Sequence, residues 1–285
     1  MTTNPPPPGT LGPSSPPPPS PQGQVTSRNP GLSPLAKVLL FVGLPLLIIL
    51  IGIGVTLVFW VTPVSFRHTA SSSPTVAVTA PNAGIRVIPS TDDQVHVEAT
   101  GWYSGPKPTL TVDTNGGTTT IQGRCSSAWF SRCALEITVS APATVDLTVT
   151  STNGAIGVSD LTGSVRVETT NGRIDTRNLI GTLDLHTTNG AIRVAGCESE
   201  DVIAQTTNGA VDLEFTQAPS AVEARSTNGS ITVRVPDDVT YFIEAHTVNG
   251  HIDTNDIGSD RKAERTITVE TVNGGVAVKP GPTRE

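Results

Sequence analysis

Carboxylate and histidine side chains recur at fixed offsets in the second half of this 285-residue chain, and these types could support acid–base chemistry. Asp184 precedes His186 by two residues, and Glu244 precedes His246 in the same way. Glycan hydrolysis instead needs a pair of carboxylates, and only at a defined separation across a cleft. Ion pairing between neighbouring strands explains the same charges, for example Arg166 beside Asp184. We therefore assign no catalytic residue and keep a glycan-active enzyme as an alternative.

Other site chemistries find little support. The serines of the repeat, Ser151 and Ser226, are expected to face inward, without a base at fixed spacing. There is no glycine-rich phosphate loop and no aspartate ladder of the calcium-binding repeats, so we expect no cofactor and no metal. The chain carries a formal charge of −7 and shows no basic patch, which argues against a nucleic-acid partner.

The chain has three cysteines. Cys125 and Cys133 stand eight residues apart in a short loop, and in an oxidising compartment this spacing predicts a disulfide. Cys197 falls in an apolar column of the repeat together with Leu161 and Leu179, so we expect a buried free thiol. A reactive or intermolecular cysteine is the alternative for that position.

The feature that must position all these residues is a repeat built on Asn-Gly. The spacings between successive asparagines are 18, 18, 19, 20, 21 and 24 residues, and such a period indicates a repeat architecture. The turn residues are Asn153 and Gly154, Asn171 and Gly172, Asn189 and Gly190, Asn208 and Gly209, Asn228 and Gly229, Asn249 and Gly250, and Asn273 and Gly274.

Apolar residues keep one register around each asparagine. They stand six and four residues before it and three and five after it, as Leu183, Leu185, Ile192 and Val194 do around Asn189. Alternation of this kind predicts strands with one buried face on both sides of the turn.

Two folds fit this unit. Asn-Gly between alternating apolar residues is a strong hairpin signal, so a meander of hairpins is one. The other is a β-solenoid, in which Asn-Gly forms a corner and each unit stacks on the previous one. We favour the solenoid because the units match column by column. The prediction is an all-β protein with a β-solenoid (β-helix) of about seven or more rungs.

The N-terminal part has a different composition. Residues 1–34 hold twelve prolines, one charge and almost nothing apolar, so we expect a disordered proline-rich tail. An uncharged apolar run of 24 residues, from Val38 to Val61, is long enough to span a bilayer as a helix. Arg28 and Lys37 precede this run, and the positive-inside bias then places the tail in the cytoplasm and the C-terminal part outside the cell.

The expected organisation has five parts. Residues 1–34 form the cytoplasmic tail, 35–62 the transmembrane helix, 63–75 a linker, 76–279 the extracellular solenoid and 280–285 a short C-terminal tail. The repeat pattern becomes less regular before Asn153. Asn115 and Gly116 repeat the Asn-Gly pair, but the apolar residues around them stand at different offsets. Terminal repeats are commonly atypical because they cover the exposed end of the core.

The recurring T-T-N-G-x-I, as in Thr169–Ile174 and again from Thr187 to Ile192, resembles the bacterial "putative adhesin" domain of unknown function. The resemblance covers about residues 76–278. It implies a β-solenoid and a setting in the cell envelope, and it supplies no catalytic residues to carry over.

The sequence therefore predicts a single-pass membrane protein with a structural, adhesion or recognition role at the bacterial cell envelope. Its expected partners are membrane lipid, through the one helix, and a cell-surface glycan or protein. Two alternatives from other classes are a glycan-active enzyme on a β-helix scaffold and an envelope-stress sensor that signals through the cytoplasmic tail.

Overall fold

The computed structural model describes residues 33–59, 61–126 and 132–281. The chain divides into two compact units, residues 1–53 and residues 54–285. Most of the tail predicted over residues 1–34, and the last four residues of the tail predicted over 280–285, lie outside the described residues.

An apolar helix forms the described part of the N-terminal unit and continues past it. It consists of α1 (Pro34–Val38), a π-helical turn η1 (Leu39–Gly43) and α2 (Leu44–Phe59). The wide turn ends at Gly43, two residues before Pro45. In a regular helix a proline has no N–H to donate, and its ring clashes with the carbonyl four residues earlier. Residues 34–54 have a mean hydropathy of 2.6, and none of this span is buried inside the protein. An apolar helix with no protein covering it is compatible with a single membrane anchor.

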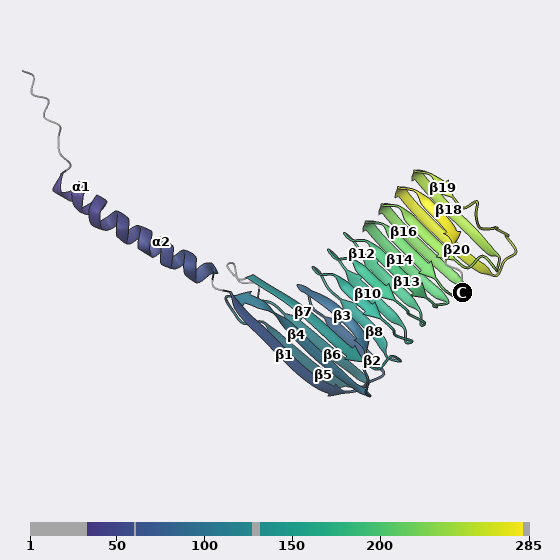
Figure 1. The fold of residues 1–285 in the computed structure, drawn as a ribbon, viewed down its shortest axis with the longest axis horizontal. Coiled ribbons are helices and arrows are strands. Elements are labelled where there is room, and N and C mark those ends of the chain that lie inside the picture. Colours follow the sequence, from purple (N-terminus) through teal and green to yellow (C-terminus); the bar gives the residue numbers. More distant parts are fainter. Residues whose placement is uncertain (1–32, 60, 127–131, 282–285) are drawn as a thin grey trace, which may run out of the picture. The chain divides into compact units, whose positions relative to one another are not determined.

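Apart from the end of α2, the second unit consists of strands, and the domain after the helix is all-β as predicted (Figure 1). They are β1 (Thr62–Ser71), β2 (Thr75–Thr79), β3 (Ala83–Pro89), β4 (Gln94–Ser104), β5 (Thr109–Asn115), β6 (Thr118–Arg124), β7 (Arg132–Ala141), β8 (Asp146–Thr150), β9 (Ile156–Ser159), β10 (Val165–Thr169), β11 (Ile174–Arg177), β12 (Leu183–Thr187), β13 (Ile192–Cys197), β14 (Asp201–Asn208), β15 (Val211–Phe215), β16 (Ala221–Asn228), β17 (Ile231–Val235), β18 (Tyr241–Asn249), β19 (Ile252–Asp253), β20 (Arg265–Asn273) and β21 (Val276–Pro280).

The strands form two sheets. Sheet A has the order β1-β4-β7-β3-β9-β11-β13-β15-β17-β21-β19, and sheet B has the order β18-β20-β16-β14-β12-β10-β8-β2-β6-β5. The two strands on either side of each Asn-Gly from Asn153 to Asn273 lie in different sheets, and each pairs in parallel with its equivalents in the neighbouring rungs, as β10 does with β12. This arrangement confirms the solenoid and excludes the meander of hairpins.

Alternation of inward and outward residues produces the core. In β12 and β13, Leu183, Leu185, Ile192 and Val194 are each at most 2% exposed. The equivalent positions of the other rungs stack above and below them in a single apolar cluster. One rung alone could not bury this face, so its stability depends on its neighbours.

The final two rungs do not stack in sequence order. The rung of Asn273 (β20 and β21) inserts between the rungs of Asn228 and Asn249, so β18 and β19 lie at the end of the solenoid. The prediction that each unit stacks on the previous one is therefore wrong at this point. The physical reason is the 24-residue spacing before Asn273, which leaves enough chain to pass over one rung. Ile252, expected to face the core, is 37% exposed because no further rung covers it.

The N-terminal end of the solenoid is closed by antiparallel strands. Residues 63–75, predicted as a linker, contain most of β1, which pairs antiparallel with β4 along its whole length. Asn115 and Gly116 do not repeat the corner. They belong to an antiparallel hairpin between β5 and β6, where Gly116 and Gly117 have φ of 60° and 81°. Asn115 pairs with Thr118, so the two loop residues are Gly116 and Gly117, and Gly-Gly suits a hairpin turn with positive φ at both positions.

One further rung has no Asn-Gly pair and was not predicted from the sequence. Asn82 is followed by Ala83, but Val76, Val78, Ile85 and Val87 stand at the usual offsets from it and are buried. Its strands β2 and β3 pair in parallel with β8 and β9. This rung brings the rungs with a corner asparagine to eight, and β6 and β7 continue the stack by pairing in parallel with β2 and β3.

Candidate functional site

The corner asparagines form a continuous ladder along one edge of the solenoid. From Asn153 onward, the Nδ2 atom of each asparagine donates to the Oδ1 atom of the one before it in the stack, over 2.8–2.9 Å. In spatial order the ladder contains Asn82, Asn153, Asn171, Asn189, Asn208, Asn228, Asn273 and Asn249. Each inner amide both donates and accepts, which fixes the position of every corner relative to the next.

The glycines after these asparagines allow the corners to stack closely. A Cβ atom added to Gly190 would lie 2.0 Å from the carbonyl oxygen of Gly172, and one added to Gly209 would lie 2.0 Å from that of Gly190. Any side chain there would separate the rungs. These glycines are required by the close approach of backbones, whereas a hairpin turn would require them for positive φ.

A column of Ser and Thr hydroxyls supports the same edge from inside. In five rungs the hydroxyl two residues before the asparagine donates to the carbonyl oxygen of a neighbouring corner glycine, as in Thr187 Oγ1 to Gly172 O at 2.9 Å and Ser226 Oγ to Gly209 O at 3.0 Å. Ser151 Oγ donates to Ala80 O instead, and Thr169 Oγ1 has no partner among the described residues. The ladder, the stacked glycines and this column together hold the sheet B strand ends in register.

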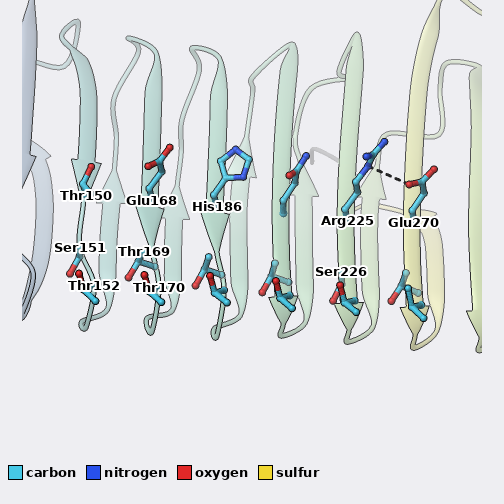
Figure 2. Close-up of a pocket in the computed structure, with 18 of the residues that line it drawn as sticks. Thr150, Ser151, Thr152, Glu168, Thr169, Thr170, His186, Arg225, Ser226 and Glu270 are labelled. Atoms are coloured by element: carbon cyan, nitrogen blue, oxygen red, sulfur yellow. Dashed lines mark ion pairs between the residues drawn. The ribbon is translucent and has the colours of Figure 1, made fainter.

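A groove runs along sheet B beside this edge and has a volume of about 730 Å³. We call it the sheet B groove. Figure 2 shows its side chains in rows across successive strands, with Thr150, Glu168 and His186 at one level. From β8 to β18 the lining crosses six strand spacings, roughly 29 Å at about 4.8 Å each. Its residues are Thr150–Thr152, Glu168–Thr170, His186–Thr188, Gln205–Thr207, Arg225–Thr227, Glu270–Val272, His246 and Val248.

Two outward columns give the groove its chemistry. One holds the exposed hydroxyls of Thr152, Thr170, Thr188, Thr207 and Thr227, which stand directly before the corner asparagines. The other is mixed: Thr150, Glu168, His186, Gln205, Arg225, Glu270 and His246 follow one another along the stack. The surface therefore presents hydrogen-bond donors and acceptors on every rung.

Ion pairs hold several of these side chains in place. Arg166 contacts both Glu168 and Asp184, and Asp184 also contacts the ring of His186. The hydrogen bond to Glu168, together with the charge of Asp184, raises the pKa of Arg166. Arg225 Nε lies 3.4 Å from Glu270 Oε2 and 3.2 Å from Glu223 Oε1.

The residue pairs singled out for acid–base chemistry have different surroundings. Asp184 and His186 are in contact, but Arg166 already neutralises Asp184. Of the second pair, His246 lines the groove, whereas Glu244 is not among its lining residues. The carboxylates that line the groove, Glu168 and Glu270, lie on β10 and β20, four strand spacings or roughly 19 Å apart. Within the described ranges, no three His, Cys, Asp or Glu side chains come together as metal ligands would.

The cysteines lie away from this groove. Cys125 and Cys133 are joined in a disulfide with Cα atoms 5.8 Å apart, linking the end of β6 in sheet B to β7 in sheet A. Cys197 is free and fully buried. Burial raises the pKa of its thiol, which keeps the sulfur protonated and unreactive.

The chain is similar to several known proteins. Three solved structures resemble the chain: a "putative adhesin" from Bacteroides fragilis (14% identity, 76% of this chain and 97% of that one, TM-score 0.48), a "putative adhesin" from Parabacteroides merdae (10%, 76% and 96%, 0.45) and a "putative lipid binding protein" from Parabacteroides distasonis (11%, 76% and 96%, 0.45). No curated protein matched the chain. Residues 134–279, just over half of the chain, match the family described as Toastrack DUF4097. The chain is thus a member of the Toastrack DUF4097 family, with a β-solenoid fold.

Proposed function

We propose that this protein is a membrane-anchored recognition protein of the bacterial cell envelope, and that the sheet B groove binds an extended glycan at the cell surface. The observation that carries the proposal is the groove itself, which crosses seven rungs and offers polar groups on each of them. A linear polymer could contact the same hydroxyl column repeatedly along its length.

The composition of the groove favours a glycan over a protein partner. The cores of protein interfaces are rich in aromatic and other apolar side chains. Here the apolar side chains are Val248 and Val272, both at the far end of the stack. Threonine and serine hydroxyls, two imidazoles, two carboxylates, an amide and a guanidinium make up the rest, which suits a ligand covered in hydroxyl groups.

The spacing of the acids favours binding over hydrolysis. Glycosidases place their two carboxyl groups about 5 to 9.5 Å apart. Glu168 and Glu270 are separated by about twice the upper value, at four strand spacings of about 4.8 Å. We therefore propose a non-enzymatic role.

The apolar helix supplies the anchor, and the proposed orientation places the proline-rich tail in the cytoplasm and the solenoid outside. The excess of basic residues before the helix supports this orientation. The Cys125–Cys133 disulfide supports it too, because such bonds persist in oxidising compartments.

A glycan array probed with the full chain in phosphatidylcholine nanodiscs tests the binding proposal. We expect selective binding to one class of glycan, and at least tenfold weaker binding by the Thr188→Phe variant, whose ring would fill the middle of the groove. The matched control is Arg234→Gln on the outer face of sheet A, which should bind like the original protein. Absence of glycan binding, or equal binding by Thr188→Phe, would contradict the proposal.

A further inference from the structure

A second groove lies on the outer face of sheet A and has a volume of about 480 Å³. Its floor is β9, where the outward residues Gly157 and Ser159 are small, with Ala155 just before the strand. The neighbouring strands β3 and β11 form its two sides. We call it the sheet A groove.

Arginines line both sides of this groove. Arg86 on β3 lies directly across from Gly157, and Arg177 on β11 lies directly across from Ser159. Arg173 precedes β11, and Arg193 follows on β13. The lining acids are Asp175 and Glu136, so four guanidinium groups face two carboxylates. This local excess of positive charge contrasts with the net charge of −9 for residues 62–285, which contain 16 basic and 25 acidic residues.

The four arginines differ in their ion pairs within the described part of the chain. Arg173 pairs with Asp175, and Arg193 Nε lies 4.0 Å from Asp212 Oδ2. For Arg86 and Arg177, no ion pair is formed with any residue that the structure describes. They flank the floor from opposite sides, Arg86 opposite Gly157 and Arg177 opposite Ser159.

The open floor is not a requirement of the fold. A Cβ atom at Gly157 would find its nearest neighbour, the carbonyl oxygen of Asp175, at 4.0 Å, which is ordinary contact. The corner glycines differ, because a Cβ atom at Gly190 would lie 2.0 Å from a backbone oxygen. The packing thus leaves room for a side chain at residue 157. Because Gly157 has no side chain, the space between Arg86 and Asp175 is open.

The shape restricts the ligand. The backbones of β3 and β11 are two strand spacings apart, roughly 10 Å, and the floor from Ala155 to Ser159 is roughly 13 Å long. Because β9 is already paired on both edges, a peptide could not add to it as a strand. Recognition must come from the side chains, and guanidinium groups bind carboxylates and phosphates in a bidentate manner.

We infer that the sheet A groove is an anion-binding site that takes an acidic glycan chain, whose carboxylate or phosphate groups bind between Arg86 and Arg177. A membrane surface fits less well, since the arginines border a furrow and the same face also presents Asp175, Asp212 and Glu214. This site is separate from the sheet B groove and does not depend on its proposed function.

Binding of polygalacturonate, a linear glycan with one carboxylate per sugar, tests the inference. The full chain is held in phosphatidylcholine nanodiscs, and affinity is measured by interferometry at low and high salt. We expect binding that weakens as salt rises, and none to the fully methyl-esterified polymer. Arg86→Gln and Arg177→Gln should each lower the affinity about tenfold, and Gly157→Leu should abolish binding by filling the floor.

Two controls separate a built site from general charge. Arg234→Gln removes the same charge from the same sheet outside the groove, and its affinity should stay within about twofold. The urea midpoint of Gly157→Leu should match that of the original chain, which shows that the variant folds.

The inference is overturned if Arg86→Gln and Arg177→Gln bind as the original does, or if Arg234→Gln loses as much affinity as they do. It is also overturned if the chain ignores polygalacturonate but binds vesicles containing phosphatidylglycerol. Millimolar inorganic phosphate should compete with the polymer, as expected if single anionic groups are what the arginines hold.

Discussion

Neighbouring residues on one strand of the solenoid face opposite environments, and Ile192 and Arg193 show the contrast. Ile192 is 1% exposed inside the apolar stack, whereas the Arg193 side chain is 62% exposed beside Asp212. Ile192→Asp would bury a carboxylate without a partner, at a cost of several kcal/mol. Arg193→Asp should cost under about 1 kcal/mol, because exposed pairs contribute little. Urea midpoints of the two variants measure this; equal midpoints would mean that the inward face is misassigned.

A second contrast at the scale of single residues concerns two glycines. Gly190→Ala places a methyl group 2.0 Å from the carbonyl oxygen of Gly172, so the corners must separate and the Asn171–Asn189 hydrogen bond is strained. We expect a loss of more than about 2 kcal/mol. Gly157→Ala has open space and should be neutral or slightly stabilising, since glycine is unfavourable in a strand. Thermal unfolding of both variants tests the pair, and a neutral Gly190→Ala would show that the corners are not tightly stacked.

Tyr241 gives the solenoid end a pH dependence. Its side chain is fully buried at the start of β18, and its hydroxyl donates to the carbonyl oxygen of Pro236 at 3.0 Å. Burial raises the pKa of Tyr241 to about 12. Between pH 10 and about 12 the unfolded chain has lost this proton while the folded chain keeps it, so stability falls with rising pH across that window. Below pH 10 the contribution is complete.

The Tyr241→Phe variant tests this assignment, because it cannot lose a phenolic proton. Urea midpoints of both proteins at pH 9 and pH 11.5 should show a larger alkaline loss for the original chain. The same loss in both proteins would assign the pH dependence to other groups.

At the scale of elements, the columns around each asparagine were predictable from the sequence, and the order of the last rungs was not. Each unit carries the same inward pattern, so β17 could accept either β19 or β21 as its neighbour with similar burial. In the sequence, only the longer spacing before Asn273 indicates that its rung inserts between those of Asn228 and Asn249. Asn82 was missed because Ala83 replaces the glycine, although its apolar offsets are regular.

Protection of backbone amides from exchange tests the rung order. β20 and β21 are paired on both sides, whereas β18 and β19 form the outer edge of their sheets. We expect amides of β20 to exchange more slowly than those of β18, although β20 is nearer the C-terminus. A stack in sequence order would give the opposite ranking, because β20 would then be the edge.

The whole molecule combines an apolar helix with a solenoid that presents a groove on each sheet. The groove residues could be seen in the sequence as outward columns, but the grooves themselves could not. The sheet A groove depends on the small side chains of β9 lying between Arg86 and Arg177, which are far apart in the sequence. Its basic character was also hidden, because the net charge of the chain is −7.

The most direct test of the central claim, a recognition solenoid displayed outside the membrane, is cysteine labelling on intact cells. A membrane-impermeant maleimide should not label the original chain, because Cys125 and Cys133 are bonded to each other and Cys197 is buried. Thr188→Cys places a thiol in the sheet B groove, and Ser20→Cys places one in the tail. We expect intact cells to label Thr188→Cys, and Ser20→Cys to react only after permeabilisation. Labelling of Ser20→Cys with protection of Thr188→Cys would contradict both the orientation and the proposed role at the cell surface.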